Sequence, residues 1–217
     1  MSRFAAKHAT ELDESIKEKD EHYQHGFAFP TEHYSHILKP GLRTGVVQEI
    51  SHIKAEPEWM LKKRLEGFQH FEAKPTPTWG GDLSAIDYDQ IHYYLRPTDR
   101  QAQKWEDVPP EIKTTFDRLG IPEAEKKYLA GVKMQYDSEV VYGSLKNIWA
   151  KDGVIFLSMD EGLAQYPDLV KEYFGKLIPS GDNKFAALNT AVWSGGSFVY
   201  VPKGVHVKLP LQTYFRI

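Results

Sequence analysis

Apolar and polar residues recur with the period of an α-helix over residues 44–73. From Thr44 the apolar residues recur at helical spacing until Pro57 ends one helix and begins another. In that second helix Leu61, Leu65 and Phe68 follow the i, i+4, i+7 pattern, while charged residues occupy the other face. The pattern therefore predicts two consecutive helices.

Proline and glycine interrupt the middle of the chain. Residues 74–101 are predicted to form a loop with a short strand near Ile91–Leu95. Two short helices are predicted after it, one following Pro109-Pro110 and ending at Gly120, the next running from Pro122 to Gly131.

The stretch Tyr136–Trp149 can be read in two ways. Val140 and Val141 favour a strand, whereas Leu145 and Trp149 favour a helix. The pattern alone leaves both readings open.

A strand followed by a helix is the clearest local signal in the rest of the chain. Gly153 leads into the apolar run VIFLS, and Ser158 with Glu161 has the spacing of a capping box at a helix start. A further helix is predicted to open at Pro167 and to run towards Leu177.

From Phe185 onward the sequence is predicted to be rich in strands. Short runs such as KFAALNTAVW, SFVYV and LQTYFRI are separated by glycine and proline. Val205, Val207, Leu209 and Leu211 alternate with polar residues or proline, which is typical of a half-buried strand. Strands of this length with this punctuation are typical of a β-helix or jelly-roll.

Composition places the chain among soluble proteins of the cytosolic type. Hydrophobic residues make up 41% of the 217 residues, charged residues 26%, and the net charge is −3. This balance gives no electrostatic case for nucleic acid or an anionic membrane as a partner. The start has no apolar segment of a secretory signal, and no run is long enough to cross a membrane. We therefore expect a cytoplasmic protein.

Cysteine is absent from the chain. Its absence excludes disulfides, a thiolate nucleophile and cysteine-ligated zinc or iron–sulfur sites within these residues. No motif for phosphate, dinucleotide or zinc-protease chemistry occurs in the sequence either.

Three weaker features could carry chemistry. EHYQH and EHYSH repeat a histidine pair, and the two pairs could meet on a metal if they lay on facing helices, although GFAFP between them breaks any continuous helix. Asp87 and Asp89 could act as an acid–base pair, but a solvated loop is the better interpretation. SGGS at 194–197 indicates a hairpin turn rather than a phosphate cradle, and His206 lies on the polar phase of a strand. The four histidines of the two pairs are His22, His25, His33 and His36.

Long stretches of the chain resemble the SufB/SufD family of the SUF iron–sulfur cluster assembly system. The resemblance runs from about Gly41 to Ile217, and EPEWML and IPEAEKKYLAGV point to the SufB branch. The segments that carry it are EPEWMLKKRLEGFQHF (56–71), WGGDLSAIDYDQIHYYLRPTDR (79–100), VPPEIKTTFDRLGIPEAEKKYLAGV (108–132), YDSEVVYGSL (136–145) and residues 153–217, including NKFAALN and SGGSFVYVPKGV.

The resemblance implies a fold and an organisation. We expect an α+β chain with a polar, possibly flexible leader over 1–40, a mainly helical region over 41–150, and a βα unit with the first rungs of a right-handed parallel β-helix over 151–217. Family members run considerably longer than 217 residues, so the chain is expected to be an N-terminal portion, cut soon after the β-helix begins.

The resemblance also implies partners and a role. Family members work with a SufD-like subunit, a SufC-like ATPase and a sulfur-donor protein, and the complete assembly builds an iron–sulfur cluster. The chain is accordingly expected to be a scaffold component rather than an enzyme, with no cofactor or metal bound by itself and no catalytic residue. Arg216 of the YFRI motif resembles a position on the family's sulfur path, where a guanidinium could stabilise a persulfide anion; a purely structural arginine is the other reading.

Two other functions stay open on the sequence. The chain could be a stable interaction module that recruits SUF subunits or sulfur donors without holding a cluster. It could also be an unrelated metal-dependent enzyme that uses the leader histidines with Asp87 and Asp89.

Overall fold

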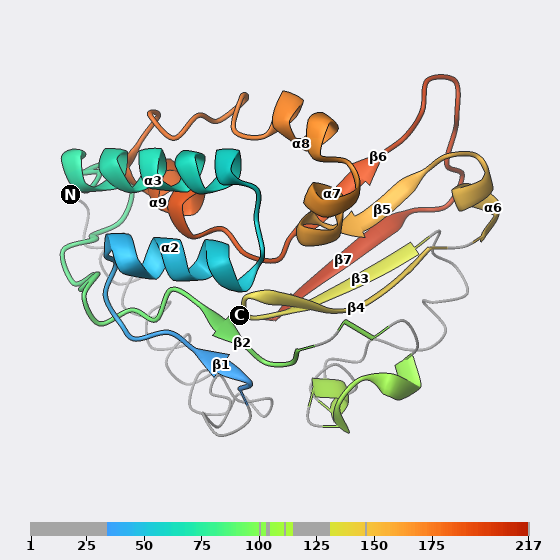
Figure 1. The fold of residues 1–217 in the computed structure, drawn as a ribbon, viewed down its shortest axis with the longest axis horizontal. Coiled ribbons are helices and arrows are strands. Elements are labelled where there is room, and N and C mark those ends of the chain that lie inside the picture. The colour runs from blue at the N-terminus through green and yellow to red at the C-terminus, as the bar shows by residue number, and fades with distance from the viewer. Residues whose placement is uncertain are drawn as a thin grey trace, which may run out of the picture.

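The structure of the protein, a computed structural model, describes residues 34–99, 101–102, 105–110, 112–114, 131–145 and 147–216. These residues form a mixed α+β arrangement in which a layer of helices lies beside small sheets (Figure 1). The α+β class predicted from the sequence is therefore confirmed. Among the helices described, none is long and apolar enough to cross a membrane.

Three helices make the helical layer, α2, α3 and α9, which span Thr44–Ile53, Glu58–Ala73 and Lys184–Val192. The first two are the helices predicted from periodicity. Pro57 is the N-cap of α3 rather than its first helical residue, so the helix begins one residue later than predicted. At the N-cap the missing N–H of proline leaves no hydrogen bond unmade. Val47 and Ile50 of α2 are fully buried against the other helices and Tyr94. The local pattern of apolar residues was therefore sufficient to predict α2 and α3.

The prediction of a strand over KFAALNTAVW is wrong, because this segment is helix α9. The side chain of Asn183 caps the helix by accepting hydrogen bonds from the backbone N–H groups of Phe185 and Ala186. Ala187 and Ala191 then face α3 and are fully buried. Close packing between helices, rather than a sheet, determines the state of this segment.

Gly67 of α3 makes this close packing possible. A Cβ at position 67 would lie 2.9 Å from Cβ of Thr190 and 3.0 Å from the backbone of Ala187 and Ala191. Two of these three contacts are with backbone atoms, which cannot rotate away. The two helices therefore approach each other over a position that admits only glycine.

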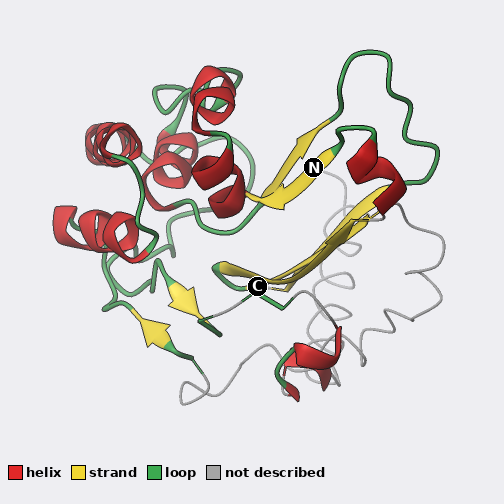
Figure 2. Cartoon of the chain, turned by 45° about the vertical axis from the view of Figure 1, so that its right-hand side comes forward, coloured by secondary structure: helices red, strands yellow, loops and turns green. Residues whose placement is uncertain are grey.

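Three sheets lie beside the helices (Figure 2), namely a short antiparallel pair of His36–Ile37 with Leu95–Arg96 and two longer sheets. The larger has the order β4-β3-β7, in which β3 pairs antiparallel with β4 and parallel with β7. The smaller is an antiparallel pair of β5 and β6. The strands span Gly131–Tyr136 (β3), Glu139–Leu145 (β4), Ile155–Ser158 (β5), Ser197–Tyr200 (β6) and Leu211–Arg216 (β7).

Short elements connect these layers. The ambiguous stretch Tyr136–Trp149 contains both predicted states, because a strand runs to Leu145 and the helix α6 then buries Trp149. The remaining elements are β1 (His36–Ile37), β2 (Leu95–Arg96), η2 (Trp105–Asp107), α6 (Asn147–Lys151), α7 (Met159–Gln165) and α8 (Pro167–Tyr173).

The strand predicted near Ile91–Leu95 and the end of one helix are displaced in the structure. That strand, β2, begins only at Leu95, and α8 ends at Tyr173 rather than near Leu177. Residues 110 and 112–114 are helical, as predicted after Pro109-Pro110. The helix predicted from Pro122 to Gly131 lies outside the described residues, apart from Gly131, which begins β3.

No β-helix is formed by the described residues. A β-helix needs parallel strands stacked in register, whereas here β5 and β6 pair antiparallel and only β3 with β7 is parallel. The predicted strand over 205–210 is irregular chain, and only Leu211 of the alternating set lies in a strand. SGGS does not form a hairpin either, because it joins helix α9 to strand β6 rather than one strand to another; Gly195 and Gly196 have positive φ in this connection.

A fully buried ion pair joins α3 to the end of α9. Nε and Nη2 of Arg64 donate to the two carboxylate oxygens of Glu56 at 2.7 and 2.6 Å. The same guanidinium donates from Nη1 to the carbonyl of Ala191 at 3.0 Å and from Nη2 to that of Trp193 at 2.9 Å. It also lies 4.5 Å from the centre of the Trp193 ring. Arg64 therefore satisfies carbonyls that the end of α9 leaves unpaired.

We expect Gly67→Ala to destabilise the protein, because the new methyl group must push α3 and α9 apart. The cost should be about 1–3 kcal/mol in the free energy of unfolding, measured by urea denaturation. Gly45→Ala in α2 is the matched control, since nothing lies within 4 Å of a Cβ at that position. It should raise stability by up to about 1 kcal/mol through helix propensity. Equal effects at the two positions would contradict the close packing.

Replacing Arg64 by methionine should lower the free energy of unfolding by about 3–5 kcal/mol, because Glu56 would remain as an unpaired buried charge. Lys62→Met on the exposed face of the same helix provides the control, since its pairing with Glu58 is exposed to solvent. That change should leave the urea midpoint almost where it was. A mild effect of Arg64→Met would show that the ion pair does not hold the helices together.

Candidate functional site

Most features selected in the sequence do not form a site. Asp87 and Asp89 are exposed in a turn, where the N–H of Asp89 donates to Oδ1 of Asp87 at 3.0 Å, so the solvated-loop interpretation is confirmed. His206 is exposed, as expected for a surface histidine. Of the four leader histidines, only His36 belongs to the described residues. These residues contain no group of three or more potential metal ligands.

Arg216 is the last residue of β7 and is paired with Tyr136 of β3. Its backbone therefore has a defined place in the larger sheet, at the end of the strand. The proposed sulfur-path role of its side chain stays a prediction.

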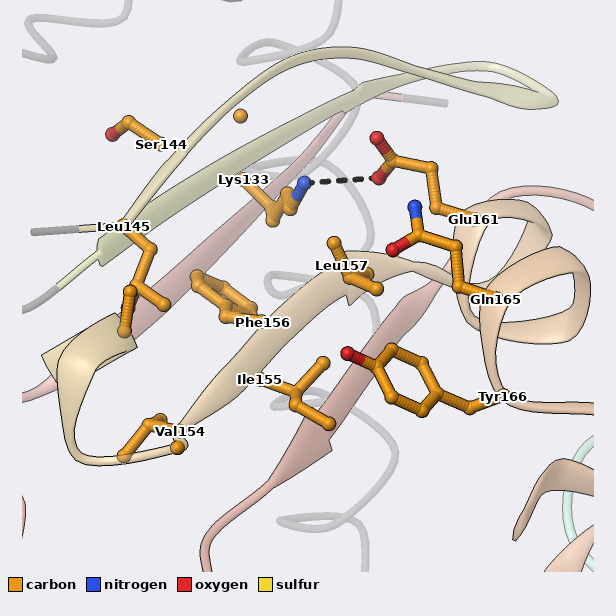
Figure 3. A pocket seen from close by; sticks show the side chains of 13 residues that line it. Lys133, Ser144, Leu145, Val154, Ile155, Phe156, Leu157, Glu161, Gln165 and Tyr166 are labelled. Carbon is orange, nitrogen blue, oxygen red and sulfur yellow. Dashed lines mark hydrogen bonds and ion pairs between the residues drawn. The ribbon is translucent and has the colours of Figure 1, made fainter. Parts of the chain in front are cut away.

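A cavity of about 450 Å³ lies between strands β4 and β5 and helix α7 (Figure 3). Leu145, Ile155 and Phe156 give it apolar walls. Two charged side chains reach into it from different elements, Lys133 from β3 and Glu161 from α7. The cavity thus combines apolar side chains with polar ones, Gln165 and Tyr166 among them, and with one cation and one anion.

Lys133 is buried in the central strand of the larger sheet. All six residues of β3 are buried, and the Lys133 side chain is only 4% exposed. The side chain lies across Gly143 of the neighbouring strand, because a Cβ there would be 2.4 Å from Nζ. A glycine inside a buried strand weakens the strand, and here it provides the space that the lysine occupies.

Glu161 is fixed by the capping box of α7. The N–H and the Oγ of Ser158 both donate to Oε2 of Glu161, at 2.8 and 3.0 Å, and the Ser158 hydroxyl accepts from the Glu161 N–H. Burial favours the neutral form of this carboxyl group, but the Ser158 N–H and the charge of Lys133 outweigh it, and the pKa of Glu161 is lowered. The capping box predicted from the sequence is therefore confirmed, and it places a carboxylate in the cavity.

The contact between Lys133 and Glu161 is long. Nζ lies 3.4 Å from Oε2, beyond the usual range of 2.7–3.2 Å for such a hydrogen bond. Burial lowers the pKa of Lys133, and the nearby carboxylate compensates only in part. Lys133 is therefore a buried amine whose cationic form is poorly stabilised.

The preceding residue of α7, Asp160, pairs with another lysine whose side chain is buried, Lys54. Nζ of Lys54 donates to Oδ2 of Asp160 at 2.7 Å and to Oε1 of Glu139 at 3.1 Å. The Tyr94 hydroxyl donates to the same Glu139 oxygen at 2.5 Å. Burial raises the pKa of Glu139, and Lys54 opposes this without cancelling it. This network connects α2, α7 and β4.

Polar contacts also fill the space between the two sheets next to the cavity. The amide oxygen of Gln135 accepts from the N–H of Gly196 at 2.8 Å, and its amide nitrogen donates to the carbonyl of Asp137 at 2.8 Å. The hydroxyl groups of Ser197 and Thr213 lie 2.9 Å apart. These hydrogen bonds therefore join the two sheets next to the cavity that Lys133 lines.

Reading the sequence did not single out Lys133. The available signal was a charged residue within GVKMQY, a run otherwise typical of a buried strand. A lysine at such a position is rarely buried without a partner. Its partner, Glu161, comes later in the sequence, after strands β4 and β5.

Comparisons with known proteins match most of the chain. Residues 48–213 match the family described as the SufBD protein N-terminal region. The chain is similar to the iron–sulfur cluster assembly protein SufB of Bacillus subtilis, with 55% identity over 177 residues, covering 82% of this chain and 38% of that protein. An iron–sulfur cluster assembly SufBD family protein of Mycobacterium tuberculosis is 58% identical over 178 residues, which are 82% of this chain and 21% of that protein. The chain therefore spans well under half the length of these relatives.

We expect the stability difference between the wild type and Lys133→Met to depend on alkaline pH. Because the pKa of Lys133 is lower in the folded protein than its ordinary value of 10.5, the folded state loses this proton first as the pH rises. In that window the unfolded chain binds more protons, so the wild type gains stability relative to the variant up to about pH 10.5. Urea titrations from pH 7 upward would measure the difference, and a difference that does not change with pH would contradict the shift.

Glu161→Gln tests the acid side in the same way. The lowered pKa of Glu161 means that its contribution is complete above the ordinary value of 4.5 and is lost as the pH falls through the folded-state pKa. The variant keeps a capping box, because glutamine can replace glutamate in it. The wild type should therefore lose more stability than the variant between pH 5 and pH 3, in roughly the titration range of carboxyl groups.

Proposed function

The chain belongs to the SufBD family, and from this we propose that it serves as a scaffold component of iron–sulfur cluster assembly. The observation that carries the proposal is the match of residues 48–213 to the family's N-terminal region, together with 55% identity to a SufB protein. We propose a SufB-like role within a complex that also contains SufD-like and SufC-like subunits and receives sulfur from a donor protein. In this role the chain is not an enzyme, and ATP hydrolysis belongs to the SufC-like partner.

Iron and sulfur are cargo in this proposal, and the cluster needs ligands from outside these 217 residues. The chain has no cysteine, and thiolates are the usual ligands of iron–sulfur clusters. We therefore propose that this region positions and connects, while other polypeptide supplies the cluster ligands. A cytoplasmic location is part of the same proposal.

The role proposed for Arg216 is to stabilise a sulfur anion during transfer. A guanidinium is always charged and offers several N–H donors, which suits a persulfide. The place of Arg216 at the end of β7 supports this, because among the described residues β7 has a strand partner, β3, on one side alone. We propose that the other edge of β7 receives the next parallel strand of a β-helix.

We keep the division into 1–40, 41–150 and 151–217 as a proposal about sequence regions. The second and third regions share the helical layer, because α9 packs on α3. Any division of function between these two regions therefore divides residues that belong to one hydrophobic core.

A protein-interaction module that holds no cluster is the second candidate function. The observation in its favour is a set of exposed apolar side chains after α8 and along β6, at positions where a monomeric surface is usually polar. Leu177 is 97% exposed, and the other members of the set are Tyr173, Ile178, Val199 and Tyr200. A SufC-like or SufD-like subunit is the occupant that the family suggests.

The test is a chimera in which residues 41–217 replace the matching region of Bacillus subtilis SufB. We expect the chimera to restore cluster assembly in cells that lack SufB, read from the activity of an iron–sulfur enzyme. Arg216→Ala in the chimera should reduce that activity by about 10–100-fold, the value of a hydrogen bond to a charged group. Lys208→Ala, at an exposed position before β7, should leave it unchanged.

Three outcomes separate the proposals. A chimera that is expressed and folded but inactive would overturn the scaffold role of this region. An active chimera that tolerates Arg216→Ala would overturn only the sulfur-path role. Copurification of the 217-residue chain with the SufC-like and SufD-like subunits, without activity of the chimera, would favour the interaction module.

A further inference from the structure

Two lysines with buried side chains among the described residues, Lys54 and Lys133, are satisfied to very different degrees. Lys54 has two carboxylate partners at 2.7 and 3.1 Å, and its Nζ lies within 6 Å of the centres of two aromatic rings. Lys133 has a single polar partner in the described residues, Glu161, at 3.4 Å, and its Nζ lies 5.9 Å from the centre of one aromatic ring, that of Phe156. An ammonium group has three N–H donors, and a buried one that is not paired costs folding free energy. A purely structural role explains Lys54 and leaves Lys133 unexplained.

Lys133 also differs from Lys54 in what it faces. Its side chain lines the cavity of about 450 Å³, opposite apolar walls that include Leu145 and Ile155 (Figure 3). Gly143 leaves the space in which its amine lies, since any Cβ there would occupy the position of Nζ. A buried amine, a cavity that admits a small molecule and an adjacent carboxylate are the components of lysine sites that react with carbonyl compounds.

We propose that Lys133 is a nucleophilic amine that binds small neutral aldehydes covalently in this cavity. The neutral amine attacks the carbonyl carbon, forming the C–N bond as the C=O π electrons move to oxygen. Proton transfer from nitrogen to that oxygen gives a carbinolamine. Loss of water then gives the imine, so one aldehyde is taken up and one water is released without any oxidant or reductant. The inference does not depend on the role in cluster assembly.

Glu161 fits the proton transfers of this reaction. Its carboxylate is 3.4 Å from Nζ, so a small approach on ligand binding brings it within hydrogen-bond distance, where it can accept the proton that nitrogen loses and return it to the departing oxygen. The Ser158 hydrogen bonds hold Oε2, while Oε1 has no partner among the described residues. The lowered pKa of Lys133 supplies the neutral amine at lower pH than for an exposed lysine.

The same carboxylate decides the class of ligand. A negative charge beside Nζ repels an anionic ligand and favours a neutral one. The cavity is lined by apolar side chains such as Phe156 and by the uncharged polar side chains of Gln165 and Tyr166, and a volume of about 450 Å³ accommodates a molecule as large as an aromatic aldehyde. A neutral aldehyde therefore fits the site better than an α-keto acid or an inorganic anion.

The test is reductive trapping on the full 217-residue chain. The protein is incubated at pH 7 with benzaldehyde and cyanoborohydride, which reduces imines to stable secondary amines, and the modified lysines are identified by peptide mass mapping. We expect Lys133 to be modified several-fold faster than the exposed Lys171 and Lys203, since its lowered pKa gives it a larger fraction of neutral amine. Lys54 should remain unmodified in the same sample.

Variants distinguish the mechanism from general reactivity. Lys133→Met should remove the fast modification, and Lys171→Met, at an exposed position of α8, should keep it. Glu161→Gln, which retains the capping box, should slow the trapping at Lys133. Circular dichroism and the urea midpoint confirm that each variant is folded, so that loss of modification is not loss of structure.

The proposal is overturned if Lys133 is modified no faster than the exposed lysines of the folded protein. It is also overturned if acetate at matched ionic strength protects Lys133 while benzyl alcohol does not, because the cavity would then be an anion site. Protection by benzyl alcohol without protection by acetate supports the neutral ligand class.

Discussion

The buried pairing of Arg64 with Glu56 is the constraint on which the arrangement of the layers depends. A guanidinium without solvent must have all its donors engaged, and those of Arg64 reach both Glu56 and the carbonyls at the end of α9. Since α9 leads through Gly195 and Gly196 directly into β6, fixing its end also fixes where the smaller sheet begins. A single side chain, that of Arg64, therefore fixes where the helical layer lies relative to the smaller sheet.

The first turn of α7 joins the rest of the molecule in a similar way. Its two acidic residues, Asp160 and Glu161, are adjacent in the chain and pair with lysines on opposite sides, Lys54 beyond α2 and Lys133 in β3. The two pairs have different character, because one lysine is fully engaged and the other faces a cavity. Of two neighbouring residues in this short helix, Asp160 therefore holds α7 against Lys54 at the end of α2, whereas Glu161 lies beside Lys133 in the cavity.

How far the sequence predicts this structure depends on how local each cause is. Helices α3 and α7 begin on signals carried by a few adjacent residues, Pro57 and the pair of Ser158 with Glu161, and both starts were predicted to within one residue. Helix α9 was predicted as strand, because what stabilises it is contact with Gly67 from a distant part of the chain. The site around Lys133 was missed for the same reason, since its cavity is made by strands and a helix that follow later in the sequence. The alternation at Val205, Val207 and Leu209 was misleading, because alternation without a neighbouring strand does not make a sheet.

The parallel pairing of β3 with β7 has a consequence for any division of the chain. The larger sheet is complete only when Gly131 and Leu211 lie side by side, and everything between them, including α7, α8 and α9, must be arranged first. Contacts so distant in sequence raise the contact order and slow folding. The shortest continuous segment that contains the whole sheet runs from Gly131 to Arg216, so a boundary drawn inside this interval would separate the central strand from its parallel neighbour.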